Sequence, residues 1–156
     1  MNLCLDSSTV IDLLRDRMPD TRRHMQAALD AGSTLWMSPM VVQEVAAGAL
    51  LSRRPEHHLN QLDVFLRRTR IAELTADDGF SAGRLRADFQ KACRKIGALD
   101  VLIAGQAVAR GWTIVTGNPR CFLFIHGLSV INWSVSDQPL DQAAMVASLH
   151  RPPPKD

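Results

Sequence analysis

The sequence predicts one α/β domain, in which a short, mostly parallel β-sheet is flanked by helices on both faces. Two observations carry this prediction. Short apolar runs alternate along the chain with longer segments whose apolar residues recur three and four positions apart. The chain has 156 residues, of which 46% are hydrophobic, and this is the size and composition of a single globular domain with its own core.

The expected strands are short apolar runs, at residues 2–5, 34–37, 70–74, 112–116 and 128–132. The expected helices show helical spacing of apolar residues, at residues 7–14, 20–32, 39–51, 57–68, 75–92 and 98–110. Capping residues set several boundaries. Asp20 is the expected N-cap of the second helix, and Ser38 followed by proline starts the third. Thr75 with Asp78 three residues later resembles a capping box, and Gly111 ends the last helix.

The chain is expected to divide into a domain and a tail. Residues 1–133 form the domain, and residues 134–156 form a C-terminal tail that is partly disordered and ends in a proline-rich run. In an open parallel sheet the ligand site lies beyond the carboxyl ends of the strands. Asp6 and Asn118 both fall at such ends, so we expect the functional site there.

Composition and motifs exclude several classes of protein. Charged or polar residues interrupt every hydrophobic run, which predicts no membrane span. The first residues contain Asp6 and Asp12 and lack a basic leader, which predicts no secretory signal and a cytoplasmic location. Three cysteines without C-x-x-C spacing predict reduced thiols, and the scattered histidines predict no zinc site. The sequence has no phosphate-loop, dinucleotide-binding or serine-hydrolase motif.

The charge balance is mildly basic. The net charge is +2, and 15 of the 18 basic residues are arginine. Several of these residues are adjacent pairs, such as Arg53-Arg54 and Arg94-Lys95. The planar guanidinium suits phosphate contacts, but a solvated surface is the commoner use of such pairs. The arginines alone therefore do not establish nucleic-acid binding.

Three acidic residues lie in the most apolar parts of the chain without a basic partner nearby in sequence. Asp6 follows a buried-type strand, Glu44 is the only ionisable residue between positions 38 and 51, and Asp100 begins a helix whose next charge is Arg110. An ionised carboxylate in apolar surroundings is costly unless it is paired or bound to a metal. We therefore expect the three carboxylates to converge on one divalent cation.

Each of these residues also has a purely structural interpretation. Asp6 could cap the first helix, and Asp100 would be favoured by the positive end of its own helix dipole. Glu44 has no capping role in mid-helix, but it could reach solvent or a distant arginine. Asn118, in the run T-G-N-P, is by default a turn residue.

Four segments, in order, resemble the motifs of the PIN-domain ribonucleases, in particular the VapC-type toxins of prokaryotic toxin–antitoxin pairs, FitB-like members included. The run LDSSTVIDLL resembles the opening motif with Asp6, and SPMVVQEV resembles the second with Glu44. The run IGALDVLIAGQAVARG resembles the third with Asp100, and WTIVTGNPRCF resembles the fourth with Asn118. Many members carry aspartate in place of this asparagine, so a second cation would be held less firmly.

The resemblance implies a metal-dependent endoribonuclease that cuts structured RNA, often transfer RNA. Asp6, Glu44 and Asp100 would be its catalytic carboxylates and would bind Mg²⁺ or Mn²⁺, because hard oxygen ligands without histidine or cysteine favour these ions. One of the three would accept a proton from the attacking water. The resemblance also implies a small VapB-like antitoxin as partner and a homodimer, with no membrane.

Further residues are expected to assist these carboxylates. Asn118 would orient water or a ligand as a fourth catalytic group, and Ser8 and Thr116 would orient substrate or water. The expected RNA phosphate contacts are basic residues of the surface, namely Arg53, Arg94, Lys95 and Arg120.

Two other functions are open at this stage. The chain could be a catalytically weak PIN-fold protein that binds RNA or an antitoxin and binds metal poorly because of Asn118. Alternatively, Asp6 could be the phosphoacceptor of a receiver-like or haloacid-type domain. The sequence lacks the D-x-D-x-T run of the latter type after its first strand, which disfavours this function.

Overall fold

A computed structural model describes residues 1–16 and 18–149 of the chain. Strands and helices alternate along it, as the sequence predicts. The strands are β1 (Asn2–Leu5), β2 (Thr34–Met37), β3 (Arg70–Ile71), β4 (Thr113–Val115) and β5 (Val130–Ile131). The helices are α1 (Ser7–Arg15), α2 (Pro19–Asp30), α3 (Pro39–Leu50), α4 (Pro55–Leu66), α5 (Ala76–Lys91), α6 (Ala98–Arg110), the 3-10 helix η1 (Pro119–Cys121) and α7 (Gln142–Leu149).

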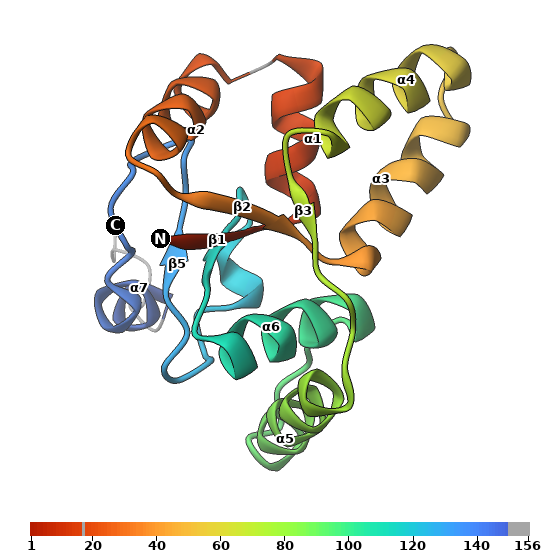
Figure 1. Cartoon of the computed structure of the whole chain (residues 1–156). Helices are drawn as coiled ribbons and strands as arrows, with labels where there is room; N and C mark the ends of the chain where they lie inside the picture. Colours follow the sequence, from red (N-terminus) through yellow and green to blue (C-terminus); the bar gives the residue numbers. More distant parts are fainter. Residues whose placement is uncertain (17, 150–156) are drawn as a thin grey trace, which may run out of the picture.

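The strands form one parallel sheet in the order β3-β2-β1-β4-β5. β1 lies at the centre, where Leu3 pairs with Leu35 of β2 on one side and with Thr113 of β4 on the other. Helices α1, α2 and α4 lie on one side of the sheet, and α5 and α6 lie on the other (Figure 1). The predicted fold class, a parallel sheet between layers of helices, is confirmed.

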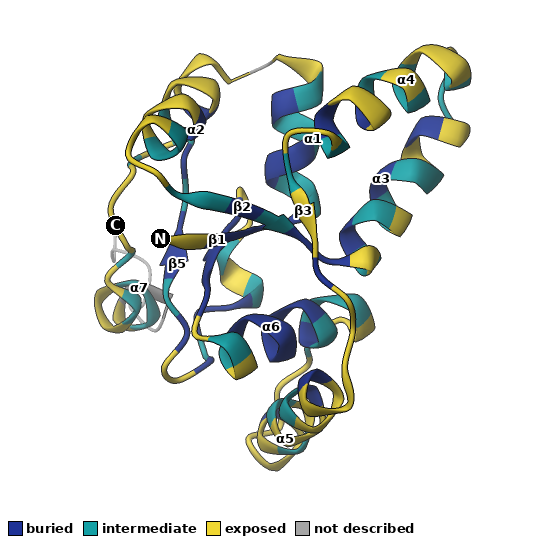
Figure 2. Ribbon diagram, viewed as in Figure 1, coloured by how far each residue is buried: buried dark blue, intermediate teal, exposed yellow. Residues whose placement is uncertain are grey.

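The core lies on both faces of the two central strands. Cys4 and Leu5 of β1, and Ile114 and Val115 of β4, have no exposed surface. Figure 2 shows these strands dark blue between helices whose outer faces are yellow. Strands buried on both faces are continuous apolar runs in sequence, which is why the pattern locates them well. Their carboxyl ends are therefore fixed by a rigid platform.

Proline moves two of the predicted helix starts. α2 begins at Pro19 with Met18 as its N-cap, so Asp20 lies in the first turn and the predicted cap is wrong. α4 begins at Pro55, two residues before the predicted start. In both cases the fixed φ of proline suits the first helical position, where its missing N–H costs nothing.

Two predicted strands are shorter than expected. The segment 70–74 contains only the two residues of β3, and the segment 128–132 only the two of β5. The predicted tail, residues 134–156, contains α7 in its described part, and Gln142 of that helix donates a hydrogen bond to the Leu128 carbonyl at 2.6 Å. Residues 150–156 lie outside the described residues.

Two expectations from composition can be compared with the structure. The cysteines, Cys4, Cys93 and Cys121, carry free thiols. Burial, and next the charge of Asp6, raise the pKa of the Cys4 thiol to about 12, so this thiol is neutral in the core. Within residues 1–16 and 18–149, no helix combines the length and the apolar content needed to cross a membrane.

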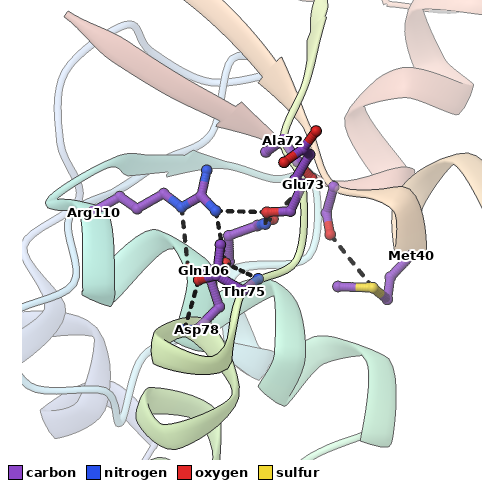
Figure 3. A network of polar contacts seen from close by, with 8 residues as sticks. Met40, Ala72, Glu73, Thr75, Asp78, Gln106 and Arg110 are labelled. Carbon is purple, nitrogen blue, oxygen red and sulfur yellow. Dashed lines mark hydrogen bonds and ion pairs between the residues drawn. The ribbon is translucent and has the colours of Figure 1, made fainter.

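A polar network fastens the start of α5 to the end of α6 (Figure 3). Arg110 donates to both carboxylate oxygens of Asp78, at 2.7 and 3.1 Å, and to the Glu73 carbonyl at 2.6 Å. Thr75 and Asp78 form the predicted capping box. Burial raises the pKa of Asp78, but the hydrogen bonds from Arg110 and Thr75 outweigh burial and hold this pKa at about 2. The network therefore fixes α6 against its neighbours.

Helices α5 and α6 approach most closely at Gly105. A Cβ there would lie 2.6 Å from the backbone of Ala82. We expect Gly105→Ala to lower the free energy of unfolding by about 1–2 kcal/mol, because overpacking outweighs the better helix propensity of alanine. Gly83→Ala on α5 is the matched control, since no atom lies within 4 Å of its new Cβ. Chemical denaturation measures both, and equal stability of the two variants would contradict the close approach.

Candidate active site

Asp6 lies directly after β1, at the carboxyl end of the central strand. Its backbone N–H donates to the Val115 carbonyl at 2.9 Å, which extends the pairing of β1 with β4. Its side chain is only 5% exposed, and Oδ2 accepts hydrogen bonds from the hydroxyls of Ser8 and Thr116, both at 2.8 Å. Asp6 is the N-cap of α1 but makes no side-chain cap bond. The capping interpretation of this carboxylate is therefore wrong, and the carboxylate faces the end of β4 instead.

The two hydroxyls have no other proton to donate, because each carries one and uses it on Asp6. Their oxygens accept instead. The Ser8 hydroxyl accepts from the Gly117 N–H at 2.9 Å, and the Thr116 hydroxyl accepts from the Asn118 N–H at 3.0 Å. The structure thus brings Ser8, Thr116 and Asp6 together. This network holds Asp6 in one orientation and ties α1 to the loop after β4.

Glu44 lies on α3, half-buried, in the electrostatic field of the other two carboxylates. Burial raises its pKa; a hydrogen bond from Ser7 partly offsets this, and the charges of Asp6 and Asp100 raise it further. Its Oε2 atom is buried without a hydrogen-bond partner. Among the described residues, no lysine or arginine forms an ion pair with Glu44. The structural interpretation in which Glu44 pairs with a distant arginine is therefore wrong.

Asp100 lies in the first turn of α6 and is half-buried. Burial, and next the charge of Asp6, raise its pKa, and a hydrogen bond from the Cys121 thiol partly offsets both. The carboxylate folds back over Gly97, the N-cap of the helix, where a Cβ would lie 2.6 Å from Oδ2. Glycine at this position leaves the room that the carboxylate occupies.

Cys121 is a site residue that the sequence reasoning missed. Its thiol contacts Asp100, and it accepts a hydrogen bond from the Asn118 side-chain amide at 3.4 Å. Burial, and next the charge of Asp100, raise the pKa of this thiol to about 11, so it is a neutral donor. The signal in the sequence is its position three residues after Asn118, at the end of a one-turn 3-10 helix. Cys121 thereby links Asn118 to Asp100.

The basic residues predicted to contact RNA phosphates are all exposed but dispersed. Arg53 lies between α3 and α4, whereas Arg94 and Lys95 follow α5. Arg120 lies in η1, between Asn118 and Cys121 of the site. Their contact with RNA stays a prediction. In the part of the chain that the structure describes, no three histidine, cysteine, aspartate or glutamate side chains form a ready-made metal-binding group.

Comparison with known proteins gives the family. The family model for the PIN domain matches residues 3–124. Ribonuclease VapC2 of Rickettsia felis is 32% identical over 118 residues, which cover 76% of this chain and 88% of that protein. The tRNA(fMet)-specific endonuclease VapC of Shigella flexneri is 29% identical over 134 residues, which cover 86% of this chain and 99% of that protein.

A solved structure agrees with these relatives. The crystal structure of VapBC2 from Rickettsia felis, bound to a DNA fragment from its promoter, matches with a TM-score of 0.80 at 28% identity. The match covers 85% of this chain and 99% of that chain. The chain therefore belongs to the PIN-domain family. Its relatives are VapC-type members of that family, so the resemblance drawn from the four motifs is confirmed.

Proposed function

We propose that this protein is a metal-dependent endoribonuclease that cuts structured RNA and acts as the toxin of a toxin–antitoxin pair. The observation that carries the proposal is that three acids from separate parts of the chain lie close enough for the charge of Asp6 to raise the pKa values of both Glu44 and Asp100. The relatives support it, since they are named as ribonucleases and one as specific for tRNA(fMet). Transfer RNA is accordingly the first substrate to test.

The carboxylates fit Mg²⁺ or Mn²⁺. Glu44 has a buried oxygen without a partner, and the charge of Asp6 contributes to the raised pKa values of both Glu44 and Asp100. A divalent cation relieves this repulsion, and hard oxygen ligands suit these two ions. No preassembled ligand group exists among the described residues. Mg²⁺ usually keeps several waters and is bound through one or two carboxylates and a substrate phosphate, so it does not require a preassembled group.

The residues of the site then have separate roles. When bound, the ion supplies a water of lowered pKa and stabilises the charge that develops on the phosphate. Asp6, oriented by two hydroxyls, Glu44 and Asp100 would hold the ion directly or through its waters. Glu44 would also accept the proton of the attacking water. The Asn118 amide nitrogen is engaged on Cys121, so its amide oxygen is the atom left to orient water. Since Asn118 is neutral, we expect one firmly held ion.

The direct test incubates the purified protein, freed of any copurifying partner, with total structured RNA and Mn²⁺ or Mg²⁺. Discrete fragments that form with either ion and vanish in a chelator are the expected result, and sequencing of their ends identifies the target. RNA that stays intact, but binds the protein equally well with and without a chelator, would instead identify an RNA-binding protein and overturn the proposal.

Gly97→Ala is expected to lower the rate of RNA cleavage about tenfold with little loss of stability. The new Cβ would displace the Asp100 carboxylate, whereas the φ of −60° at this N-cap suits alanine. A displacement of about 1 Å at a reacting group costs rate on this scale or more. Gly79→Ala on α5, with nothing within 4 Å of the new Cβ, is the control. Single-turnover rates equal to wild type for Gly97→Ala would contradict the position of Asp100.

We further propose a small VapB-like antitoxin as the partner and a homodimer as the active assembly. The solved relative from Rickettsia felis is itself a VapBC2 complex, which supports the first of these. Carboxylates without a basic neighbour, of which Glu44 is one, favour a partner that brings a basic side chain to the site. Light scattering of the chain alone and with a coexpressed antitoxin tests both assemblies.

A further inference from the structure

We propose that a pocket beside the carboxylate site binds one nucleobase of the RNA, unstacked from a nucleotide next to the cleaved bond. This inference rests on the proposed function and names a substrate subsite for it. The pocket lies between the C-terminal half of α5 and the segment after η1, and its volume is about 260 Å³. Sites for drug-sized ligands measure roughly 300–1,000 Å³, so this smaller cavity suits a single planar base.

A stacked pair of side chains forms one wall of the pocket. The Arg94 guanidinium lies over the Phe124 ring, with its central carbon 4.0 Å from the ring centroid. Phe124 is half-buried and packs against the core, whereas Arg94 is exposed. Unpaired RNA bases stack on aromatic rings and on the planes of arginine guanidinium groups. The pair therefore offers a base a flat surface.

The backbone at the end of α5 fixes the position of Arg94. Cys93 has a φ of +55°, in the left-handed region that non-glycine residues rarely adopt. The Arg94 N–H then donates to the Phe89 carbonyl at 2.8 Å, which closes the helix end. This Schellman-type helix end fixes the direction in which the chain leaves α5 at Arg94.

The remaining lining favours a base over a phosphate. Asp88 and His126 line the pocket together with apolar side chains such as Leu85. The Asp88 carboxylate repels phosphate but accepts hydrogen bonds from the N–H groups of a base. Its contact with Lys91 is long, at 3.9 Å, and both side chains are exposed, so this ion pair is weak.

Both walls of the pocket connect directly to the carboxylate site. Arg94 precedes Gly97, the N-cap of the helix that carries Asp100, by three residues. Phe124 follows Cys121, whose thiol bonds to Asp100, by three residues. Three residues span at most about 11 Å, so the backbone of each wall lies within that distance of a residue that contacts Asp100. A base from a nucleotide flanking the reacting phosphate can therefore enter the pocket.

The test uses RNA hairpins that carry the fluorescent base 2-aminopurine at successive loop positions, bound to the full chain with Asp100→Asn. We expect the fluorescence of one position to fall on binding. Phe124→Leu and Arg94→Gln should each abolish that change and raise Kd about fivefold to a hundredfold, the range measured for loss of base stacking. Phe124→Tyr should retain both, and Arg86→Gln, on α5 but outside the pocket lining, should leave both unchanged.

Cleavage by the same variants in the chain with Asp100 intact separates the pocket from the nuclease. We expect Phe124→Leu and Arg94→Gln to raise KM more than they lower kcat, with thermal unfolding unchanged for Arg94→Gln. The pocket is overturned if RNA binds without a fluorescence change at any one position, or if such a change persists in both Phe124→Leu and Arg94→Gln. Cleavage by the wild type would still support the proposed function in that case. A change that depends on Arg94, without any cleavage by the wild type, supports the pocket and overturns the proposed function.

Discussion

Asp100→Asn is expected to lower the rate of RNA cleavage by at least about a hundredfold and to leave the fold as stable as wild type or more stable. The variant keeps the size of the side chain but removes a negative charge that would hold the metal ion, and the bound ion stabilises the charge developing on the phosphate by several kcal/mol. Burial and the charge of Asp6 raise the pKa of Asp100, so the ionised carboxylate lowers the stability of the folded protein at neutral pH. The neutral amide of asparagine avoids this loss of stability.

Single-turnover cleavage of one defined RNA with Mn²⁺ measures the rate, and calorimetry in a chelator measures the stability. Asp63→Asn is the matched control, because Asp63 lies on α4 in an exposed pair with Arg67. We expect this control to cleave as wild type does. Wild-type cleavage by Asp100→Asn would contradict the assignment of this residue, and a lower melting temperature in the chelator would contradict the raised pKa.

Asp78→Asn is expected to lower the free energy of unfolding by about 2–3 kcal/mol. The pKa of Asp78 lies at about 2 instead of 3.8, and at 1.36 kcal/mol per pKa unit this shift corresponds to about 2 kcal/mol. The side chain is 1% exposed, and its loss of charge leaves the half-buried Arg110 without its ionic partner. Denaturation in urea at neutral pH measures the effect, and Asp77→Asn, at the exposed neighbouring position, should be nearly neutral.

The lowered pKa of Asp78 also predicts that the stability of the protein depends on pH. Its pKa is lower in the folded protein than in the unfolded chain, so its contribution is complete well above pH 3.8 and is lost as the pH falls toward 2. The stability difference between wild type and Asp78→Asn should therefore be constant near neutral pH and shrink between about pH 4 and pH 2. A difference that grows on acidification would contradict the ion pair.

Local signals predicted much of the fold. The central strands are apolar on both faces, so their runs are continuous and easily recognised. The capping box at Thr75 and Asp78 and the helix end at Gly111 depend on neighbours in sequence, and both are found in the structure. The short edge strands were harder to delimit, because the pairing of β3 and β5 depends on partners elsewhere in the chain.

The acidic residues of the candidate site could be predicted from the sequence, but their contacts could not. An acid that is isolated among apolar residues is visible in sequence, which is how Asp6, Glu44 and Asp100 were selected. The contacts that orient them are not, because they join residues far apart in the chain. Thr116 bonds Asp6 across 110 positions, and the thiol of Cys121 reaches Asp100 only once η1 packs against α6.

The central claim is that Asp6, Glu44 and Asp100 form one metal site, and Mn²⁺ binding tests it most directly. Free Mn²⁺ is measured by electron paramagnetic resonance as the ion is titrated into the chain without RNA. We expect the wild type to bind one ion, and Asp6→Asn, Glu44→Gln and Asp100→Asn each to weaken that binding at least about tenfold. Equal Mn²⁺ binding by the wild type and the three variants, or none by any of them, would contradict the claim.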